Sequence, residues 1–232
     1  MPMRWCSRMK RGENKQMREG IKPVSYLALG DSLTEGIGAE SPTKSFVSQF
    51  FQHIKHSDRC HMRNWGVSGM TSEELLSLVN SPGMHKLFPK MTHISVTTGG
   101  CDFIELYERG HFGLRDLLNT SRQIIHRVKS ILSIIAMNNP ASRISLMGFY
   151  LPPPAYEWGF QTSAAIVQMM NRSYAKICEE VGCQFFNPYD VFLHRHDYFF
   201  DEVHPNQVGH DELAKLAIQS VAGESGTVHA PV

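Results

Sequence analysis

The chain of 232 residues lacks three features that would assign it to other classes of protein. No window approaches the roughly 20 consecutive apolar residues that a membrane-spanning helix needs. The five cysteines are odd in number, and their positions, 6, 60, 101, 178 and 183, lack the paired short spacings of a zinc site. The formal net charge is only +1, which gives no general attraction to nucleic acid or to a membrane surface. We therefore expect a soluble protein without a metal, a cofactor or a nucleic-acid partner.

Positive charge is concentrated in the first 22 residues, which carry seven basic and two acidic side chains. Apolar residues are scattered singly there, so this leader does not resemble a secretory signal peptide. We expect a poorly ordered, solvated tail, with an arm that touches a membrane or nucleic acid as the alternative. The absent export signal favours a cytoplasmic location with reduced thiols. One domain is expected over residues 23–222, followed by a tail over 223–232.

Past the leader, short β-branched or aromatic runs alternate with longer amphipathic segments, which is typical of repeated β-α units around a parallel sheet. The predicted strands cover residues 24–29, 60–65, 93–98, 143–149 and 184–186. The predicted helices cover residues 46–56, 72–79, 115–137, 163–181 and 206 to about 221. Right-handed crossovers turn this order into an α/β fold, a three-layer α/β/α sandwich with a five-stranded parallel sheet. Functional residues should then lie at the carboxyl ends of the strands.

Ser32 lies at such an end, in the segment Gly-Asp-Ser-Leu that begins at Gly30. A hydroxyl there can project over the edge of the sheet, and a helical turn after it would turn backbone amides toward an oxyanion. Gly-Asp-Ser alone is also common in structural turns. A serine hydroxyl needs a base to become a nucleophile, so a histidine with an orienting carboxylate has to be found.

His204 is the best candidate among the twelve histidines, because it lies in the segment Asp-Glu-Val-His-Pro-Asn that begins at Asp201. Pro205 would fix the local backbone, and a helix can begin near Asn206. Asp201, three residues upstream, can reach the imidazole and hold its tautomer while Nε2 faces a serine. An isolated Asp-x-x-His is more often a local hydrogen bond, so only its occurrence together with Gly-Asp-Ser indicates catalysis.

The combination resembles the SGNH, or GDSL, hydrolase family, which is marked by four sequence blocks in a fixed order. The matching segments are Gly30-Asp31-Ser32-Leu33, the segment from Asn64 to Thr71, Gly99-Gly100-Cys101-Asp102, and the segment from Asp201 to Asn206. Together they extend over nearly the whole chain beyond the leader. The resemblance implies a flavodoxin-like α/β/α fold and hydrolysis of esters or thioesters through an acyl-enzyme. It implies Ser32 as nucleophile, His204 as general base and then acid, and Asp201 as its orienting residue.

The resemblance also implies an oxyanion hole built from the Ser32 N–H, the Gly66 N–H and a third donor at position 101. A glycine at 66 would let the backbone approach the substrate oxygen without a Cβ. Cys101 stands where the family has asparagine, and a thiol is a weak donor with one proton, whereas an amide offers two. We expect a slower or differently tuned hydrolase; Cys101 as a nucleophile itself is a weaker alternative, because nothing adjacent in sequence would activate it.

Two other motifs are incomplete. The segment around Ser68 lacks the final glycine of a Gly-x-Ser-x-Gly nucleophile elbow. The glycines at 30, 36 and 38 do not have dinucleotide-binding spacing, and Asp31 would repel a pyrophosphate. We nevertheless expect Asp31 at the rim of the substrate site.

A stiff loop with three prolines follows the fourth predicted strand and carries Tyr156, Trp158 and Phe160. These aromatic side chains either form an apolar wall for an acyl chain or pack against the body of the protein. The expected substrate is a small-molecule carboxylic ester, such as a lysophospholipid or a short-chain ester. The alternatives are deacetylation of a carbohydrate and a non-catalytic binding role.

Overall fold

The computed structural model describes residues 22–110 and 113–222. The predicted leader, apart from Lys22, and the predicted C-terminal tail therefore lie outside the described residues. Within the described part of the chain, no helix is both long enough and apolar enough to cross a lipid bilayer. Cys60, Cys101, Cys178 and Cys183 are free thiols. The cytoplasmic location stays a prediction.

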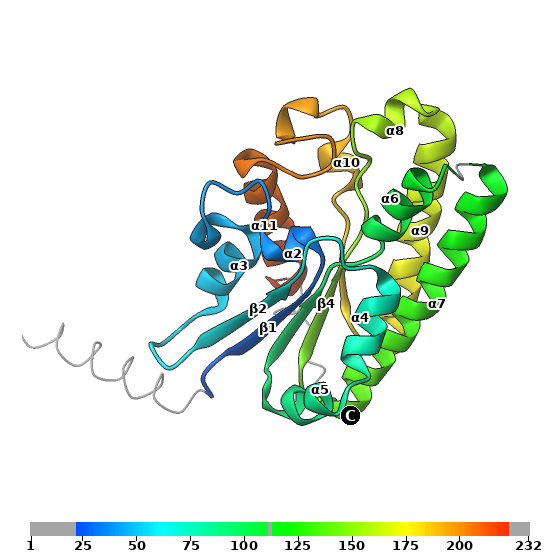
Figure 1. Cartoon of the computed structure of the whole chain (residues 1–232). Helices are drawn as coiled ribbons and strands as arrows, with labels where there is room; N and C mark the ends of the chain where they lie inside the picture. The colour runs from blue at the N-terminus through cyan, green and yellow to red at the C-terminus, as the bar shows by residue number, and fades with distance from the viewer. Residues whose placement is uncertain (1–21, 111–112, 223–232) are drawn as a thin grey trace, which may run out of the picture.

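Five short strands form one parallel sheet (Figure 1). They are β1 (Ser25–Gly30), β2 (His61–Gly66), β3 (His93–Val96), β4 (Arg143–Met147) and β5 (Gln184–Phe186). Their order in the sheet is β2-β1-β3-β4-β5, and every neighbouring pair is parallel. This is the order of flavodoxin-like doubly wound sheets. Strand β1 is buried along its whole length, as expected of a strand with neighbours on both sides and helices on both faces.

The helices follow the strands in the expected alternation. They are α2 (Ser32–Glu35), α3 (Phe46–Ile54), α4 (Ser72–Val79), α5 (Pro82–Leu87), α6 (Gly100–Glu108), α7 (Leu114–Asn138), α8 (Pro154–Glu157), α9 (Phe160–Val181), α10 (Tyr189–Phe192) and α11 (Gln207–Ala222). Short 3₁₀ turns cover Pro42–Lys44, Phe88–Lys90 and His196–Tyr198.

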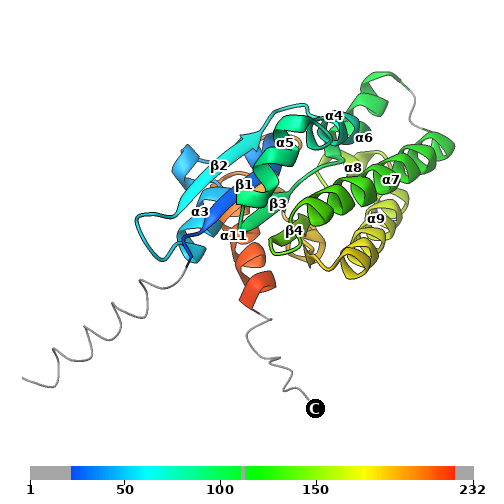
Figure 2. The ribbon, with the colours of Figure 1, turned by 90° about the horizontal axis from the view of Figure 1, so that it is seen from below.

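Helices cover both faces of the sheet (Figures 1 and 2), and two apolar cores, one on each face, hold the layers together. Leu27 and Leu29 of β1 face the core formed with α4, α5, α7 and α9. Tyr26 and Ala28 point the opposite way, toward α3 and α11, because successive side chains of a strand alternate between the two faces. The three-layer α/β/α sandwich predicted from the sequence is confirmed.

The strand order reverses at β1. The chain runs from β1 outward to β2 and then returns to β3 on the other side of β1. The loops after β1 and β3 therefore diverge toward opposite faces, and a crevice at the carboxyl ends of the strands is the usual site in such sheets. The segment that begins with Ser32 follows β1, and the segment with Cys101 follows β3. The topology thus brings two of the four sequence blocks to the same point.

The predicted boundaries differ from the observed ones in specific places. Strands β3 and β4 end at Val96 and Met147, two residues earlier than predicted, because the chain there turns into the loops that carry Thr97 and Tyr150. Helix α9 begins at Phe160, three residues earlier than predicted. The short helices α2, α5, α6, α8 and α10 were not among the predicted elements.

His210 of α11 is fully buried and joins two segments that are distant in sequence. Its Nδ1 accepts the N–H of Phe46 at 3.3 Å, and its Nε2–H donates to the carbonyl of Ile37 at 2.9 Å. Burial lowers the pKa of His210, and the hydrogen bond to Ile37 offsets this only in part. A neutral ring is therefore required, since a protonated Nδ1 could not accept the Phe46 N–H.

This arrangement predicts a loss of stability in mild acid. Because the folded-state pKa lies below the ordinary value of about 6.5, the neutral ring stabilises the fold above that pH, and the contribution is lost as the pH falls below it. Urea unfolding at pH 7.5 and pH 5 should show a larger decrease in the free energy of unfolding for the wild type than for His210→Gln. His93, whose pKa burial lowers to about 4, titrates in both proteins and cancels in the comparison. Equal decreases in the two proteins would contradict this assignment.

Candidate active site

Ser32 is the first residue of α2, at the point where β1 ends. Gly30 has a φ of 148°, and a Cβ there would lie 2.2 Å from the Thr97 carbonyl oxygen, so only glycine fits the turn. Helix α2 has a single turn and ends at Gly36, which has a φ of 102°. The serine side chain is 8% exposed. The local sequence therefore holds the hydroxyl at the edge of the sheet with little freedom to move.

Asp31 caps this helix and does not line the substrate rim, contrary to our expectation. Its side chain is 3% exposed, and Oδ1 accepts the N–H of Leu33 at 3.1 Å and the hydroxyl of Thr97 at 2.8 Å. Burial raises the pKa of Asp31, although the hydrogen bonds from Thr97 and Leu33 lower it in part. The carboxyl group turns inward because the first turn of a helix leaves N–H donors that need a partner. Asp31 therefore helps to fix the position of Ser32 from the protein interior.

The side chains of Ser32, His204 and Asp201 form a continuous hydrogen-bonded chain. Ser32 Oγ lies 2.9 Å from His204 Nε2, and His204 Nδ1 lies 2.7 Å from Asp201 Oδ2. The other carboxylate oxygen, Oδ1, accepts the backbone N–H groups of Val203 and His204 at 2.8 and 2.7 Å. With Nδ1–H donating to the carboxylate, Nε2 is left to accept the serine O–H.

The Asp201 carboxylate is kept ionised by these bonds. Burial on its own would raise the pKa of Asp201, but the hydrogen bonds from the His204 ring and from the backbone of His204 and Val203 outweigh it. The net result is a pKa below the usual value of an aspartate. A permanently charged carboxylate at this place favours the imidazolium that forms when His204 takes up a proton.

The loop that carries His204 is held in place on two sides. Tyr150, which follows β4, is buried and donates its hydroxyl to the Val203 carbonyl at 2.6 Å. Phe200 N–H donates to the His204 carbonyl at 2.8 Å, and Phe199 pairs with Pro205 as an isolated bridge. These contacts fix the imidazole relative to Ser32 without involving the reacting atoms.

Gly66 does not have the free N–H that we expected of it. Its N–H donates to its neighbour Asn64, whose Oδ1 lies 2.9 Å away. A Cβ at position 66 would lie 2.0 Å from the backbone nitrogen of Glu35, so this glycine is needed for the packing of α2 against β2. The N–H of Ser68 is also occupied, by the carboxylate of Glu35 at 2.7 Å.

Gly69, the second glycine of this segment, lies close to Cys101. Its φ of 82° is a backbone conformation that residues with a side chain rarely adopt. Its backbone amide faces the Cys101 thiol. Cys101 is the second residue of α6 and is 7% exposed. The second glycine of the segment, rather than the first, therefore meets Cys101 beside the end of the sheet.

The Cys101 thiol is protonated at neutral pH. Burial raises its pKa to about 12, and the negative charges of Asp31 and Asp102 contribute to the rise. The Gly69 amide lowers it in part. Since the thiolate is the nucleophilic form of cysteine, these values argue against Cys101 as a nucleophile and leave it a weak S–H donor.

The sequence profile of the GDSL-like Lipase/Acylhydrolase family matches residues 28–212 of the chain. The chain belongs to this family. It is therefore a hydrolase that acts on ester bonds. Spore germination lipase LipC of Bacillus licheniformis is 23% identical over 202 residues, which cover 83% of this chain and 93% of LipC.

Solved structures of other proteins share the fold of this GDSL-like hydrolase. The lipase Lip_vut3 from a goat rumen metagenome superimposes with a TM-score of 0.74 at 22% identity, over 85% of this chain and 97% of that one. A catalytic mutant of Axe2, an acetylxylan esterase from Geobacillus stearothermophilus, gives a TM-score of 0.64 at 19% identity, over 90% and 99% of the two chains. These likenesses establish the common architecture.

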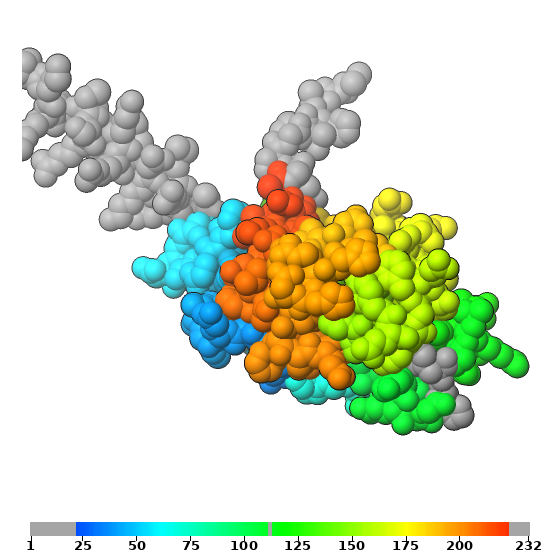
Figure 3. Space-filling model, turned by 90° about the horizontal axis from the view of Figure 1, so that it is seen from above, coloured from blue at the N-terminus to red at the C-terminus, as the bar shows by residue number. Residues whose placement is uncertain are grey.

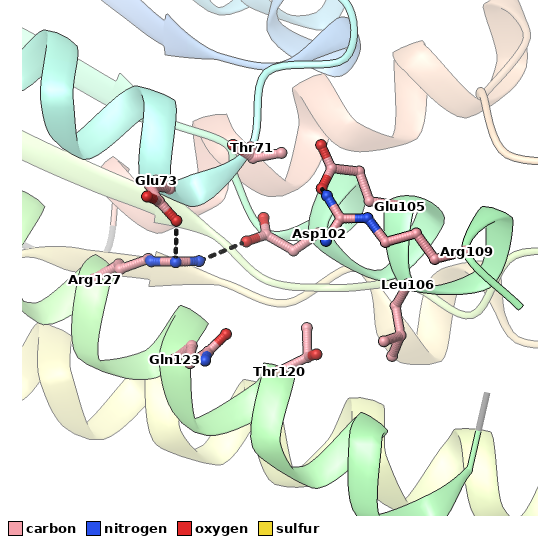
Figure 4. A pocket seen from close by; sticks show the side chains of 9 residues that line it. All are labelled: Thr71, Glu73, Asp102, Glu105, Leu106, Arg109, Thr120, Gln123 and Arg127. Carbon is pink, nitrogen blue, oxygen red and sulfur yellow. Dashed lines mark hydrogen bonds and ion pairs between the residues drawn. The ribbon is translucent and has the colours of Figure 1, made fainter. Parts of the chain in front are cut away.

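Asp102 connects α6 of the hydrolase to α4 and α7 (Figure 4). Its carboxylate accepts the N–H and the hydroxyl of Ser72, at 2.8 and 2.6 Å, and Arg127 Nη1 at 3.2 Å. Arg127 also pairs with Glu73. These bonds join the first turn of α4 to the first turn of α6, and so hold Cys101 beside Gly69. A polar hollow of about 310 Å³ lies between these three helices.

The three aromatic residues of the proline-rich loop have different surroundings. Tyr156 and Phe160 stack on each other with ring centroids 5.3 Å apart, and both contact the ring of His194. They belong to a small apolar cluster with Leu151 and are packing residues in the described structure. Trp158 is 39% exposed and stacks on Tyr107 of α6, with centroids 4.3 Å apart. Only Trp158 therefore resembles the predicted apolar wall.

Sequence reasoning missed Thr97, Tyr150 and Gly69. Thr97 supports Asp31, and Tyr150 supports the loop of His204, yet a single hydroxyl at a strand end carries no recognisable pattern. The sequence did offer an indication of Gly69, because it is the second glycine of the segment from Asn64 to Thr71. In the residues that the structure describes, no cluster of three or more His, Cys, Asp or Glu side chains could bind a metal ion.

Proposed function

We propose that the protein is a serine esterase that cleaves carboxylic esters through an acyl-enzyme on Ser32. The observation that carries the proposal is the hydrogen-bonded chain from Ser32 Oγ through the His204 ring to the Asp201 carboxylate, with distances of 2.9 and 2.7 Å. Such a chain is what converts a weakly nucleophilic hydroxyl into an alkoxide equivalent at neutral pH.

In the first half of the reaction, His204 Nε2 takes the proton of Ser32 as Oγ attacks the carbonyl carbon of the ester. Asp201 holds the imidazole in its tautomer and stabilises the positive charge that forms on it. The tetrahedral intermediate collapses when His204 returns the proton to the leaving alcohol oxygen, and the acyl group stays on Ser32. In the second half, a water molecule loses a proton to His204 as it attacks the acyl carbon. His204 then returns that proton to Ser32 Oγ as the bond to the acyl group breaks, which releases the carboxylic acid and restores the free enzyme.

The developing negative charge on the carbonyl oxygen needs donors on the side away from His204. We assign this role to the backbone N–H groups of Ser32 and Gly69, with the Cys101 S–H as a weak third donor. The assignment is supported by the Gly69 amide, which faces the Cys101 thiol, and by the Gly66 N–H, which is already bonded to Asn64. Two strong donors and one weak one imply slower turnover than three strong donors would give.

The acyl portion of the substrate would lie along Tyr107 and Trp158. Tyr107 lies in the last turn of α6, the helix that carries Cys101 in its first turn, and the rings of Tyr107 and Trp158 are both substantially exposed. Stacked aromatic rings supply apolar area at a small cost in side-chain entropy. This favours alkyl acyl groups and supports a lipase-like or short-chain esterase activity.

A second candidate is the removal of acetyl groups from a carbohydrate, since the proposed triad is indifferent to the alcohol. The observation in its favour is the polar hollow between α4, α6 and α7, which is lined by Asp102, Thr120 and Gln123 (Figure 4). A sugar could be bound there through its hydroxyl groups. An acetylated oligosaccharide that is hydrolysed faster than butyl acetate would favour this candidate.

A fluorophosphonate probe tests the proposal, because it reacts only with a serine that has been activated by a base. The wild type should be labelled and Ser32→Ala should not. Ser68→Ala is the matched control, since Ser68 is exposed and engages Glu35 only through its backbone N–H. Equal labelling of the wild type and Ser32→Ala would place the reactive residue elsewhere and contradict the role of Ser32. No labelling of the wild type would argue for a non-catalytic role.

A further inference from the structure

A second hollow, of about 440 Å³, lies beside the loop that carries His204. Residues 38–40, from the segment after α2, form one wall, and Phe200 together with residues 206–208 forms the other. The two walls are far apart in sequence but lie side by side in space, as Figure 3 shows for the blue and orange segments. A volume of this size is within the usual range of small-molecule sites.

The second wall is bonded directly to one of the proposed reacting residues, and the first wall follows a residue that is bonded to the other. Ile37 N–H donates to the Ser32 carbonyl at 3.1 Å, and the next residue begins the first wall. Phe200, in the second wall, donates its N–H to the His204 carbonyl at 2.8 Å. A Cβ on Gly38 would lie 2.0 Å from the Pro205 carbonyl oxygen, so the two walls meet backbone to backbone next to His204.

The hollow and two of the proposed oxyanion donors, Gly69 and Cys101, belong to segments that lead to opposite faces of the sheet. The walls of the hollow lead into α3 and α11, which pack together over one face. Gly69 leads into α4, and Cys101 is the second residue of α6. Both of these helices pack on α7 over the other face. A carbonyl oxygen directed toward Gly69 and Cys101 therefore points away from the hollow.

This geometry identifies the part of the substrate that would enter the hollow. The proton that His204 takes from Ser32 has to be returned to the oxygen of the leaving alcohol, so that oxygen must lie next to Nε2. The rest of the alcohol then extends toward the loop that carries His204, beside which the hollow lies. The acyl chain is directed elsewhere, along α6.

The polar side chains in the walls are already engaged by the protein itself. Asn206 donates to the carbonyls of Asp197 and Phe199 at 2.7 and 3.3 Å. Gln207 accepts the N–H of Glu40 at 3.0 Å and donates to the Lys44 carbonyl at 3.0 Å. The carboxylate of Glu40 pairs with the ammonium group of Lys44.

Apart from the exposed Glu40 carboxylate, the side chains that face a ligand are mainly apolar. Phe200 is 67% exposed and Val208 is 49% exposed, and both line the hollow. Large apolar side chains with this exposure in a concave site indicate a binding surface. We propose that the hollow binds the alcohol portion of the ester and selects apolar alkyl or aryl alcohols, an inference that rests on the proposed esterase function.

The test uses two series of esters with the full-length protein. In the first, acetates of methanol, butanol, benzyl alcohol and glycerol vary only the alcohol. In the second, ethyl esters of two to eight carbons vary only the acyl group. The wild type should show a higher kcat/KM for benzyl acetate than for glyceryl acetate. Val208→Ser should lower kcat/KM for benzyl acetate roughly 10-fold relative to methyl acetate, and leave the ranking of the acyl series unchanged.

Phe200→Ser provides a second variant with the same expected selectivity, and Met137→Ser is the matched control. Met137 is 73% exposed at the end of α7, at the opposite edge of the sheet, so its replacement should change neither series. This proposal would be overturned if Val208→Ser and Phe200→Ser changed the ranking of the acyl series, or changed neither series. A preference of the wild type for glyceryl acetate would also overturn it. If the fluorophosphonate probe also fails to label Ser32, the proposed esterase function fails with it; if Ser32 is labelled, only the alcohol site is rejected.

Discussion

Replacing His204 by alanine should lower kcat on an aryl acetate by roughly 10⁴- to 10⁶-fold. The imidazole is the only base within hydrogen-bonding distance of Ser32 Oγ among the described residues, so its loss leaves the hydroxyl protonated. Binding of the ester uses other surfaces, and KM should therefore change much less than kcat. Steady-state kinetics with an enzyme concentration high enough to detect the residual rate would measure the effect.

His126→Ala is the matched control for this substitution, since His126 is exposed on α7 and distant from Ser32 in the fold. Asp201→Asn should lower kcat by about 10⁴-fold, because an amide in place of the carboxylate favours the wrong tautomer of His204. A His204→Ala protein that keeps its fold and retains more than a tenth of the wild-type kcat would contradict the proposed role of His204.

Replacing Cys101 by asparagine should raise kcat on a simple aryl ester by roughly 100-fold. The side-chain amide would add two directed N–H donors where the thiol offers one weak donor. The site is prepared for a donor, because Asp102 anchors the first turn of α6 and the Gly69 amide faces position 101. The comparison is made under the same conditions with variants of equal thermal stability.

Cys101→Ala separates the effect of the new donor from the effect of removing the thiol. Because the neutral thiol is a weak donor, alanine should leave kcat within a few-fold of the wild-type value. A Cys101→Asn protein that is folded but no faster than the wild type would count against the assignment of position 101 to the oxyanion site. A large loss in Cys101→Ala would instead indicate that the thiol itself contributes strongly.

The architecture and three of the candidate site residues could be predicted from the sequence because both depend on simple regularities. Parallel strands end at one edge of the sheet, so Ser32 after β1 and the loop of His204 after β5 had to approach each other despite a separation of 172 residues. The turn Asp-x-x-His is local and closes on itself. These features need no knowledge of side-chain packing.

Other parts of the site depend on contacts that no local pattern encodes. Asp31 was expected at the rim, yet Thr97 from a neighbouring loop draws its carboxylate inward. Gly66 was expected to present a free N–H, yet Asn64 Oδ1 accepts a hydrogen bond from it. The residue is glycine because α2 packs too closely for a Cβ. Helices α2, α5, α8 and α10, of four to six residues, were missed because they are too short to show an apolar periodicity.

Trapping the acyl-enzyme tests the central claim most directly. Mixing the protein with an aryl ester, quenching in acid within milliseconds and mapping the digested protein by mass spectrometry would locate the acyl group. The proposed mechanism predicts a stoichiometric burst of the aryl alcohol and a mass increase on the peptide that contains Ser32. Ester hydrolysis with the acyl group on another residue, such as Cys101 or Ser68, would contradict the mechanism. So would hydrolysis without any covalent intermediate, in a wild type that the fluorophosphonate probe also leaves unlabelled.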